Sequence, residues 1–151
     1  MKSTKPELGY FFLADISGFS SYLAEVELEH AGDILRKLLE GVAQRIEPLL
    51  IVQAFDLDSV FAYTPKAQMS HFESLYALIE VTYTEFKSNL TSISNHITCT
   101  CAACRNVTSL DLKFMIHYGE YILSSVQENQ ILYGSDPRSE EHTSELQSHE
   151  I

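Results

Sequence analysis

The fold is decided by the stretch Tyr10-Phe11-Phe12-Leu13-Ala14-Asp15-Ile16-Ser17-Gly18-Phe19-Ser20. Its aromatic and aliphatic residues predict a buried strand that stops at Asp15. A carboxylate at the end of a buried strand is costly unless it is paired or bound to a metal. The Ser-Gly-Phe-Ser turn that follows predicts a helix start, whose free N–H groups suit a phosphate. The stretch therefore indicates a site for a metal-bound polyphosphate. The alternative is an aspartate that caps the next helix.

The composition predicts one folded domain. The chain has 151 residues, of which 45% are hydrophobic, and a formal net charge of −11. This negative charge argues against nucleic acid as a partner, since phosphate binding needs a basic face. No apolar run is long enough to span a bilayer and the N-terminus lacks a signal-peptide core, so we expect a cytoplasmic protein with no membrane partner. The three cysteines are clustered and odd in number, which is not typical of a secreted disulfide framework.

Residues 138–151 differ in character from the rest of the chain. They contain almost no apolar residues and are similar to the translation of a common sequencing-library adapter. We expect this segment to be non-native, which would leave a domain at 8–137 whose own sequence is cut off after Pro137. The alternative is a natural acidic tail.

The pattern of apolar residues predicts an α+β fold. The expected order is strand, helix, strand, strand, helix, strand, strand, which is typical of a split βαβ (ferredoxin-like) antiparallel sheet with helices on one face. The helices are expected at 20–47, where Gly32 could divide a short helix from a longer one, and at 67–90. After the first strand, further strands are expected at 49–55 (buried), 59–63, 110–123 and 130–133.

A second aspartate, Asp58, lies in the predicted reversal between the two central strands. In a split βαβ sheet the strand that ends at Asp15 is next to this hairpin, so both carboxylates can reach one point at the sheet edge. Two converging acids repel each other unless a cation lies between them. Oxygen ligands of this kind suit magnesium or manganese. We therefore predict a two-ion site for phosphoryl chemistry at Asp15 and Asp58.

Several segments resemble the motifs of class III nucleotidyl (adenylate/guanylate) cyclases. The first strand and turn look like the first metal motif of that family, and the segment after Asp58 looks like its second. Two later strands are similar as well, and the closest resemblance is to an uncharacterised bacterial branch with a Cys-x-Cys-x-x-Cys insert. The matching segments are Phe12–Ser20, Asp58–Ala62, Met115–Gly119 and Leu132–Gly134.

This resemblance implies a function and a set of site residues. Asp15 and Asp58 would hold two magnesium or manganese ions, and the nucleoside triphosphate would lie against the turn and helix start. The ribose 3′-hydroxyl would attack the α-phosphorus and release pyrophosphate, in a site built across a homodimer. The residues implied in nucleotide binding are Ile16 (through its carbonyl), Ser17, Gly18, Phe19 and Ser20.

The chain also departs from the family pattern. The glycine expected before the second aspartate is Leu57, so a bulky residue would have to make a turn that favours positive φ. The two base-reading positions are Ala54 and Ile131. The transition-state Asn and Arg would lie on a helix after the last strand, beyond the end of the sequence. We therefore assign no catalytic residue and expect this chain not to be an active cyclase as it stands. The alternative function is a non-catalytic, nucleotide- or metal-binding regulatory module.

A polar stretch before the strand at 110–123 contains four potential soft ligands. His96, Cys99, Cys101 and Cys104 lie within nine positions, and tetrahedral zinc takes four such donors. We predict a structural zinc site here. The alternatives are reduced surface thiols, or an iron–sulfur site with a further ligand. No role is predicted for the remaining histidines considered: His30, His71 and His117.

Overall fold

The computed structural model describes residues 5–24, 26–69, 71–96, 101–127 and 129–134. The predicted tail at 138–151 and the predicted zinc ligand Cys99 lie outside the described residues, as does the side chain of His96.

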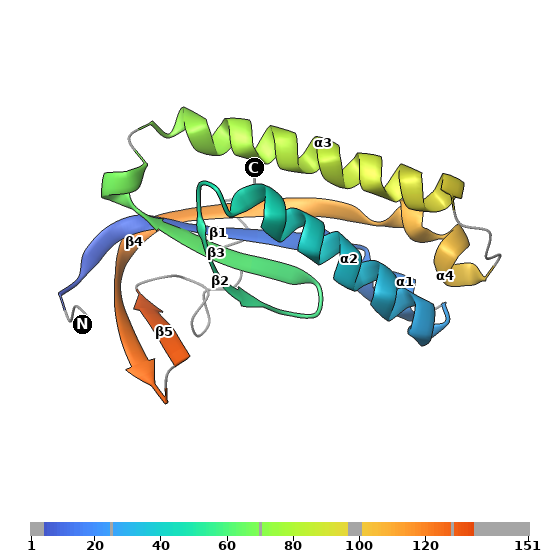
Figure 1. Cartoon of the computed structure of the whole chain (residues 1–151), viewed down its shortest axis with the longest axis horizontal. Coiled ribbons are helices and arrows are strands. Elements are labelled where there is room, and N and C mark those ends of the chain that lie inside the picture. The colour runs from blue at the N-terminus through green and yellow to red at the C-terminus, as the bar shows by residue number, and fades with distance from the viewer. Residues whose placement is uncertain (1–4, 25, 70, 97–100, 128, 135–151) are drawn as a thin grey trace.

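The described chain is an α+β fold with one five-stranded antiparallel sheet, as predicted (Figure 1). The strand order in the sheet is β2-β3-β1-β4-β5, and the first four strands of this order are those of a split βαβ unit. The longer helices α2 and α3 run along one face of the sheet (Figure 1). The elements are β1 (Glu7–Ser17), α1 (Phe19–Ala24), α2 (Leu28–Ile46), β2 (Ile51–Phe55), β3 (Ser59–Pro65), a short 3₁₀ turn (Lys66–Gln68), α3 (Glu73–His96), α4 (Ala102–Arg105), a second 3₁₀ turn (Val107–Ser109), β4 (Asp111–Val126) and β5 (Asn129–Gly134).

Strand β1 is central and separates two apolar clusters. Side chains alternate between the faces of a strand, so Phe12, Ala14 and Ile16 lie in the main core between the sheet and the helices. Phe11 points to the opposite face, where it joins a smaller cluster that includes Tyr121. This second cluster lies where β4 bends, because the first part of β4 pairs with β1 and its last part pairs with β5.

Both predicted helices have different boundaries in the structure. The first helical region is divided before Leu28 and not at Gly32. Glu27 has an extended backbone there, and its carboxylate accepts a hydrogen bond from Ala103 N–H at 3.3 Å. The second long helix begins at Glu73 and continues to His96, whereas we predicted 67–90. Its late start follows from the 3₁₀ turn after Pro65, which occupies part of the predicted helix.

The prediction that the second strand is buried is wrong. β2 lies at the edge of the sheet, and Ile51 and Phe55 are 41% and 56% exposed. A short apolar run is compatible with both a central and an edge strand, because local composition does not report how many neighbours a strand has.

Gly18 connects β1 to α1 and has a φ of +85°, a conformation that L-residues with a side chain rarely adopt. A Cβ atom at this position would also lie 3.3 Å from the Ser109 carbonyl oxygen. We expect Gly18→Ala to reduce the free energy of unfolding by about 1 kcal/mol or more.

Gly32 provides the matched control for that substitution. It lies within α2, and a Cβ atom there would have no neighbour within 4 Å. Gly32→Ala should therefore raise the free energy of unfolding by about 0.5–1 kcal/mol. Urea unfolding of both variants tests the pair of predictions. Equal effects of the two substitutions would contradict the special role of the Gly18 turn.

Candidate functional site

The sheet brings the two predicted acids together. Asp15 lies near the end of β1, in register with Ser59 on β3 and with Lys113 on β4. Asp58 comes directly before β3, and its carbonyl oxygen accepts a hydrogen bond of 2.7 Å from Ile16 N–H. The Asp15 and Asp58 carboxyl groups are close enough for one, when protonated, to donate a hydrogen bond to the other. Residues 43 positions apart in the sequence (58 − 15) thus form one acidic site.

The electrostatics of this acid pair favour a bound proton or cation. Partial burial and the neighbouring Asp58 carboxyl raise the pKa of Asp15 from 3.8 to about 6. Asp56 adds a smaller effect in the same direction, and Lys113 opposes it. Near neutral pH the pair therefore carries two unfavourably close charges, which a divalent cation would neutralise.

Leu57 makes the turn of the β2–β3 hairpin without a left-handed backbone. Among the described residues, Gln127 is the one non-glycine residue with positive φ. The turn is instead held by Asp56, whose N–H donates to the Ser59 carbonyl at 2.9 Å and whose Oδ1 accepts from Leu57 N–H at 2.9 Å. The expectation that Leu57 must adopt positive φ is therefore wrong, and the departure from glycine leaves Asp58 in place.

The residues predicted to bind phosphate follow Asp15 directly. Ile16 is buried and Ser17 ends β1, while Phe19 is the first residue of α1. The Gly18 carbonyl accepts the Tyr22 N–H at 3.0 Å, which closes the first turn of α1. The turn at 17–20 therefore lies beside the acid pair along the chain.

An apolar pocket of about 490 Å³ lies between the first two helices and the β2–β3 turn. Its wall includes Asp56 and Leu57, so it borders the turn that carries Asp58. Among the described residues, the pocket is lined by Phe19, Leu23, Leu28, Gly32, Leu35, Arg36, Leu39, Glu40, Phe55, Asp56 and Leu57. The predominance of apolar side chains suits an aromatic or aliphatic group more than a charged one.

The two positions expected to read a base are on the two edge strands of the sheet, which approach each other in space. Ala54 is in β2 and Ile131 is in β5, at opposite ends of the strand order. The Gln53 side chain nevertheless donates a hydrogen bond of 2.9 Å to the Gln130 carbonyl, because β5 folds back beneath β2 (Figure 1). Ala54 and Ile131 cannot form the hydrogen bonds that distinguish one purine from another.

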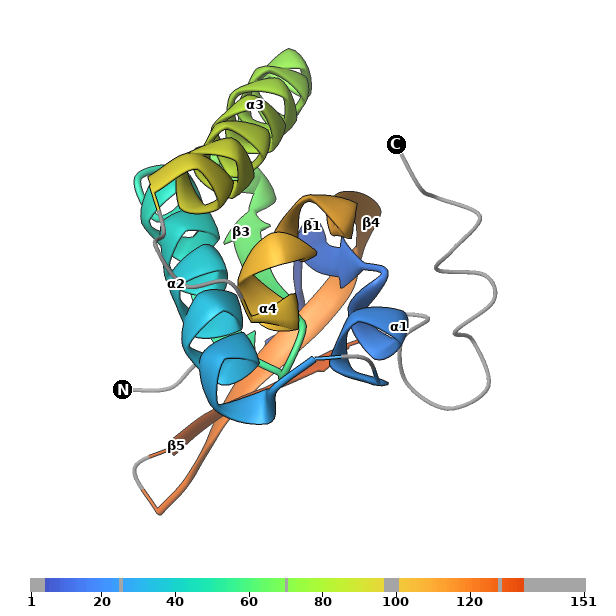
Figure 2. The ribbon, with the colours of Figure 1, turned by 90° about the vertical axis from the view of Figure 1, so that its right-hand side faces the viewer.

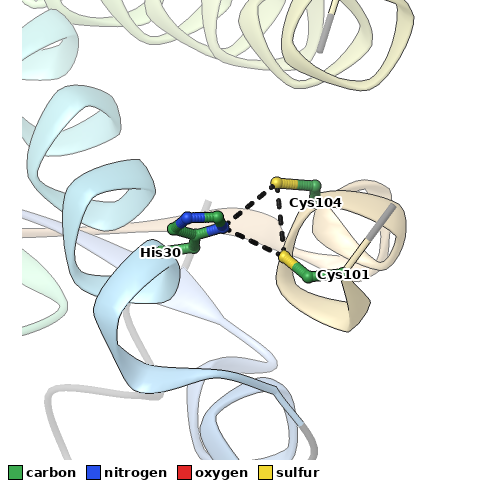
Figure 3. Close-up of side chains that lie close together, drawn as sticks. All are labelled: His30, Cys101 and Cys104. Carbon is green, nitrogen blue, oxygen red and sulfur yellow. Dashed lines mark hydrogen bonds between the residues drawn. The ribbon is translucent and has the colours of Figure 1, made fainter. Parts of the chain in front are cut away.

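A second cluster combines two predicted zinc ligands with a histidine that we had assigned no role. His30 on α2 has its Nδ1 atom 3.1 Å from Cys101 Sγ and 3.8 Å from Cys104 Sγ, and the two sulfur atoms are 3.5 Å apart (Figure 3). Cys101 precedes α4 and Cys104 lies in it. The hydrogen bond to Cys101 raises the pKa of the His30 imidazole. Sequence spacing misses His30 because it is 71 residues from Cys101.

Two further side chains hold the segment that carries these cysteines. Tyr22 Oη donates a hydrogen bond of 2.7 Å to the Ala103 carbonyl, while Glu27 accepts from Ala103 N–H. Burial raises the pKa of Tyr22 to about 12, and the nearby Cys104 and Cys101 contribute. Hydrogen bonds from its own N–H and from Ala103 N–H lower the pKa of the Glu27 carboxyl. Figure 2 shows the resulting arrangement, with α4 beside the first part of α2.

One protein family matches most of the chain. The family described as "Protein of unknown function (DUF2652)" matches residues 35–137. This range includes Asp58, Cys101 and Cys104 but neither Asp15 nor His30. No curated protein matches the sequence.

Solved structures of nucleotidyl cyclases share the fold. The adenylyl cyclase CyaB from P. aeruginosa has a TM-score of 0.70 at 16% identity, over 99% of this chain and 75% of that one. The dimeric guanylyl cyclase domain of the RhoGC fusion protein from the aquatic fungus Blastocladiella emersonii has a TM-score of 0.63 at 13% identity, over 100% and 79%. The guanylate cyclase domain of RhGC from Catenaria anguillulae, in complex with GTP, has a TM-score of 0.60 at 12% identity, over 98% and 76%. The resemblance to cyclase domains is thus confirmed at the level of the fold.

Among the described residues, no helix combines the length and the apolar character needed to cross a bilayer.

Proposed function

The chain belongs to the DUF2652 family, and we propose that it binds a nucleoside triphosphate through magnesium or manganese ions held by Asp15 and Asp58. The observation that carries this proposal is the closeness of the Asp15 carboxyl group, near the end of β1, to the Asp58 carboxyl group in the β2–β3 turn, on a fold shared with adenylyl and guanylyl cyclases. Oxygen donors that leave coordination positions open suit ions that also bind substrate phosphates.

The residues around the acid pair have compatible roles. The Ile16 carbonyl would supply a further oxygen ligand, and the turn at 17–20 would approach the phosphates with backbone N–H groups. The ions would neutralise both the acid pair and the triphosphate, which a chain with a net charge of −11 could not otherwise bind favourably. The apolar pocket beside the hairpin turn offers an adjoining surface for a non-phosphate part of a ligand.

Nucleotide binding at this site is compatible with two functions, a regulatory one and a catalytic one. Ala54 and Ile131 favour a regulatory module that binds the nucleotide without reading its base through side-chain hydrogen bonds. The intact acid pair favours cyclisation, with attack of the 3′-hydroxyl on the α-phosphorus and departure of pyrophosphate. We take nucleotide binding as the primary function and cyclisation as the second candidate.

We further propose a homodimer, since one of the similar structures is a dimeric guanylyl cyclase domain. The cytoplasmic location, the bacterial origin and the branch with a Cys-x-Cys-x-x-Cys insert stay predictions. So does the domain boundary after Pro137, the residue at which the family match also ends.

Titration of a fluorescent ATP or GTP analogue in the presence of Mn²⁺ tests the binding proposal. We expect saturable binding that requires the metal and that weakens at least about tenfold in Asp58→Asn, because loss of one charged ligand removes about 1.4 kcal/mol or more. Asp33→Asn is the matched control, since it removes the same charge from an exposed ion pair with Arg36 on α2, and Asp33 neither lines the pocket nor lies in the acid pair. Metal-independent binding, or equal losses in both variants, would contradict the assignment.

The second candidate needs a separate measurement. The protein is incubated with ATP or GTP and Mn²⁺, and both the cyclic nucleotide and pyrophosphate are quantified. Formation of both products in the wild type and not in Asp58→Asn would establish cyclisation. Binding without product would identify the non-catalytic module.

A further inference from the structure

We infer that His30, Cys101 and Cys104 bind one zinc ion, which fastens the first turns of α2 to the segment that leads into β4. This site involves neither carboxylate of the acid pair, and it goes beyond the proposed nucleotide function. It also differs from the set predicted from sequence spacing, because His30 takes the place given to His96.

The geometry of the three donor atoms matches a tetrahedral ion. Bond lengths of about 2.3 Å to sulfur and about 2.0–2.1 Å to nitrogen place tetrahedral ligand atoms about 3.5–3.8 Å apart. The three observed separations are 3.1, 3.5 and 3.8 Å. The side chains converge on one point from two elements (Figure 3). An ion therefore fits after shifts of a few tenths of an ångström.

The chemistry of the donors selects the metal. Two thiolates and an imidazole are soft or borderline ligands, which favour zinc over magnesium or calcium. Cys104 is buried, at 6% exposure, and Cys101 is half-buried. A thiolate in such a place is unfavourable unless a cation compensates its charge.

The surroundings already position the two cysteine ligands. Tyr22 and Glu27 hold the backbone of Ala103 from both its carbonyl and its N–H group, so the Cys101–Cys104 turn is fixed relative to α1 and α2. Glu27 also lies within hydrogen-bonding reach of the Cys101 thiol. Outer-shell contacts of this kind orient metal ligands. Among the residues that the structure describes, the Glu27 carboxylate is placed to supply a fourth ligand, with water as the alternative.

The role of the ion would be structural. The connection between α3 and β4 runs from residue 97 to residue 110 and contains only one turn of helix and one 3₁₀ turn in its described part. Connections of this length need a source of stability if they are to be ordered. A zinc ion held from α2 supplies it, because metal-binding free energy adds to folding free energy.

A competing chemistry for the same residues is a disulfide between Cys101 and Cys104. The Cys-x-x-Cys spacing and the 3.5 Å separation of the sulfur atoms allow it after a small movement. A disulfide would remove both thiolates and with them the site, so the two states exclude each other.

Elemental analysis of the full chain, purified in reductant without added chelator, tests the inference. We expect about one zinc per chain in the wild type, and less than about one fifth of that in His30→Ala and in Cys101→Ser. His96→Ala and His71→Ala are the matched controls and should retain the zinc. Zinc that is lost in His96→Ala and kept in His30→Ala would overturn the ligand set, and wild-type protein with a Cys101–Cys104 disulfide and no zinc would overturn the site.

A spectroscopic measurement keeps the test valid if a variant fails to fold. Wild-type protein is stripped of metal and titrated with Co²⁺, which reports thiolate and imidazole ligation in a tetrahedral site through its visible and near-ultraviolet absorption. We expect tetrahedral cobalt bands that saturate at one equivalent and disappear on addition of zinc. The absence of thiolate-to-cobalt absorption would contradict the inference.

Discussion

Asp15→Asn should stabilise the metal-free protein at pH 8 by about 1 kcal/mol, while it abolishes the stabilisation that Mn²⁺ gives to the wild type. A pKa of about 6 instead of 3.8 corresponds to about 3 kcal/mol for a group shielded from solvent. Asp15 is half-exposed, and screening reduces this penalty to about 1 kcal/mol. Asparagine has nearly the same shape and carries no charge, so the variant escapes the penalty.

The order of stability of the wild type and Asp15→Asn should reverse when Mn²⁺ is added. At a Mn²⁺ concentration of about 100 times Kd, a ligand that binds only the folded state adds about 2.7 kcal/mol to the free energy of unfolding. The wild type would gain this amount and Asp15→Asn would gain little of it. The variant is therefore expected to be the more stable protein without metal and the less stable one with metal.

The advantage of Asp15→Asn in the absence of metal should depend on pH. Because the pKa of Asp15 is raised in the fold, the folded wild type binds a proton more readily than the unfolded chain between pH 3.8 and about 6. Its stability falls as the pH rises through this window, and the penalty is complete above it. The variant should thus equal the wild type near pH 4 and exceed it at pH 7 and above.

Urea unfolding at several pH values, with chelator and with Mn²⁺, measures all three effects. Asp33→Asn serves as the control, because it removes a charge from an exposed ion pair with Arg36 that contributes little. Equal stabilities of wild type and Asp15→Asn at every pH would show that burial and the neighbouring Asp58 do not destabilise the ionised Asp15 carboxylate. Equal gains from Mn²⁺ would place the metal elsewhere.

The acid pair could be predicted from sequence because strand pairing in a split βαβ sheet determines it. Once Asp15 ends one central strand and Asp58 precedes its neighbour, the register brings them together, and the observed pairing of Asp15 with Ser59 is what this topology requires. The class of fold followed in the same way from the order of apolar periodicities. These inferences use local pattern and topology, and neither depends on the conformation of a particular side chain.

The histidine of the second cluster could not be predicted in this way. His30 has ordinary helix-surface neighbours in the sequence, and its contact with Cys101 depends on where α4 packs against α2. The spacing argument favoured His96 because it is five residues from Cys101. Ligand sets drawn from distant segments are determined by tertiary packing, which short-range spacing does not describe.

Among the substitutions proposed here that leave the zinc ligands in place, Phe12→Ala should cause the largest loss of stability. Phe12 is fully buried on the helix-facing side of β1, with its ring centroid 5.7 Å from that of Phe114. Truncation of such a side chain removes its transfer free energy and leaves a cavity that the helices can only partly fill, which costs about 3–5 kcal/mol. For a domain of this size that is a large part of the total stability.

The residue next to Phe12 tests whether the loss reflects the core or only the strand. Leu13 points to the opposite face and is half-buried, so Leu13→Ala should cost clearly less, about 1–2 kcal/mol. Urea unfolding followed by circular dichroism gives both values. A loss in Leu13→Ala as large as that in Phe12→Ala would mean that the half-buried Leu13, at the margin of the smaller cluster around Phe11, contributes as much as a residue of the main core. The expected difference between these two positions of β1 would then be wrong.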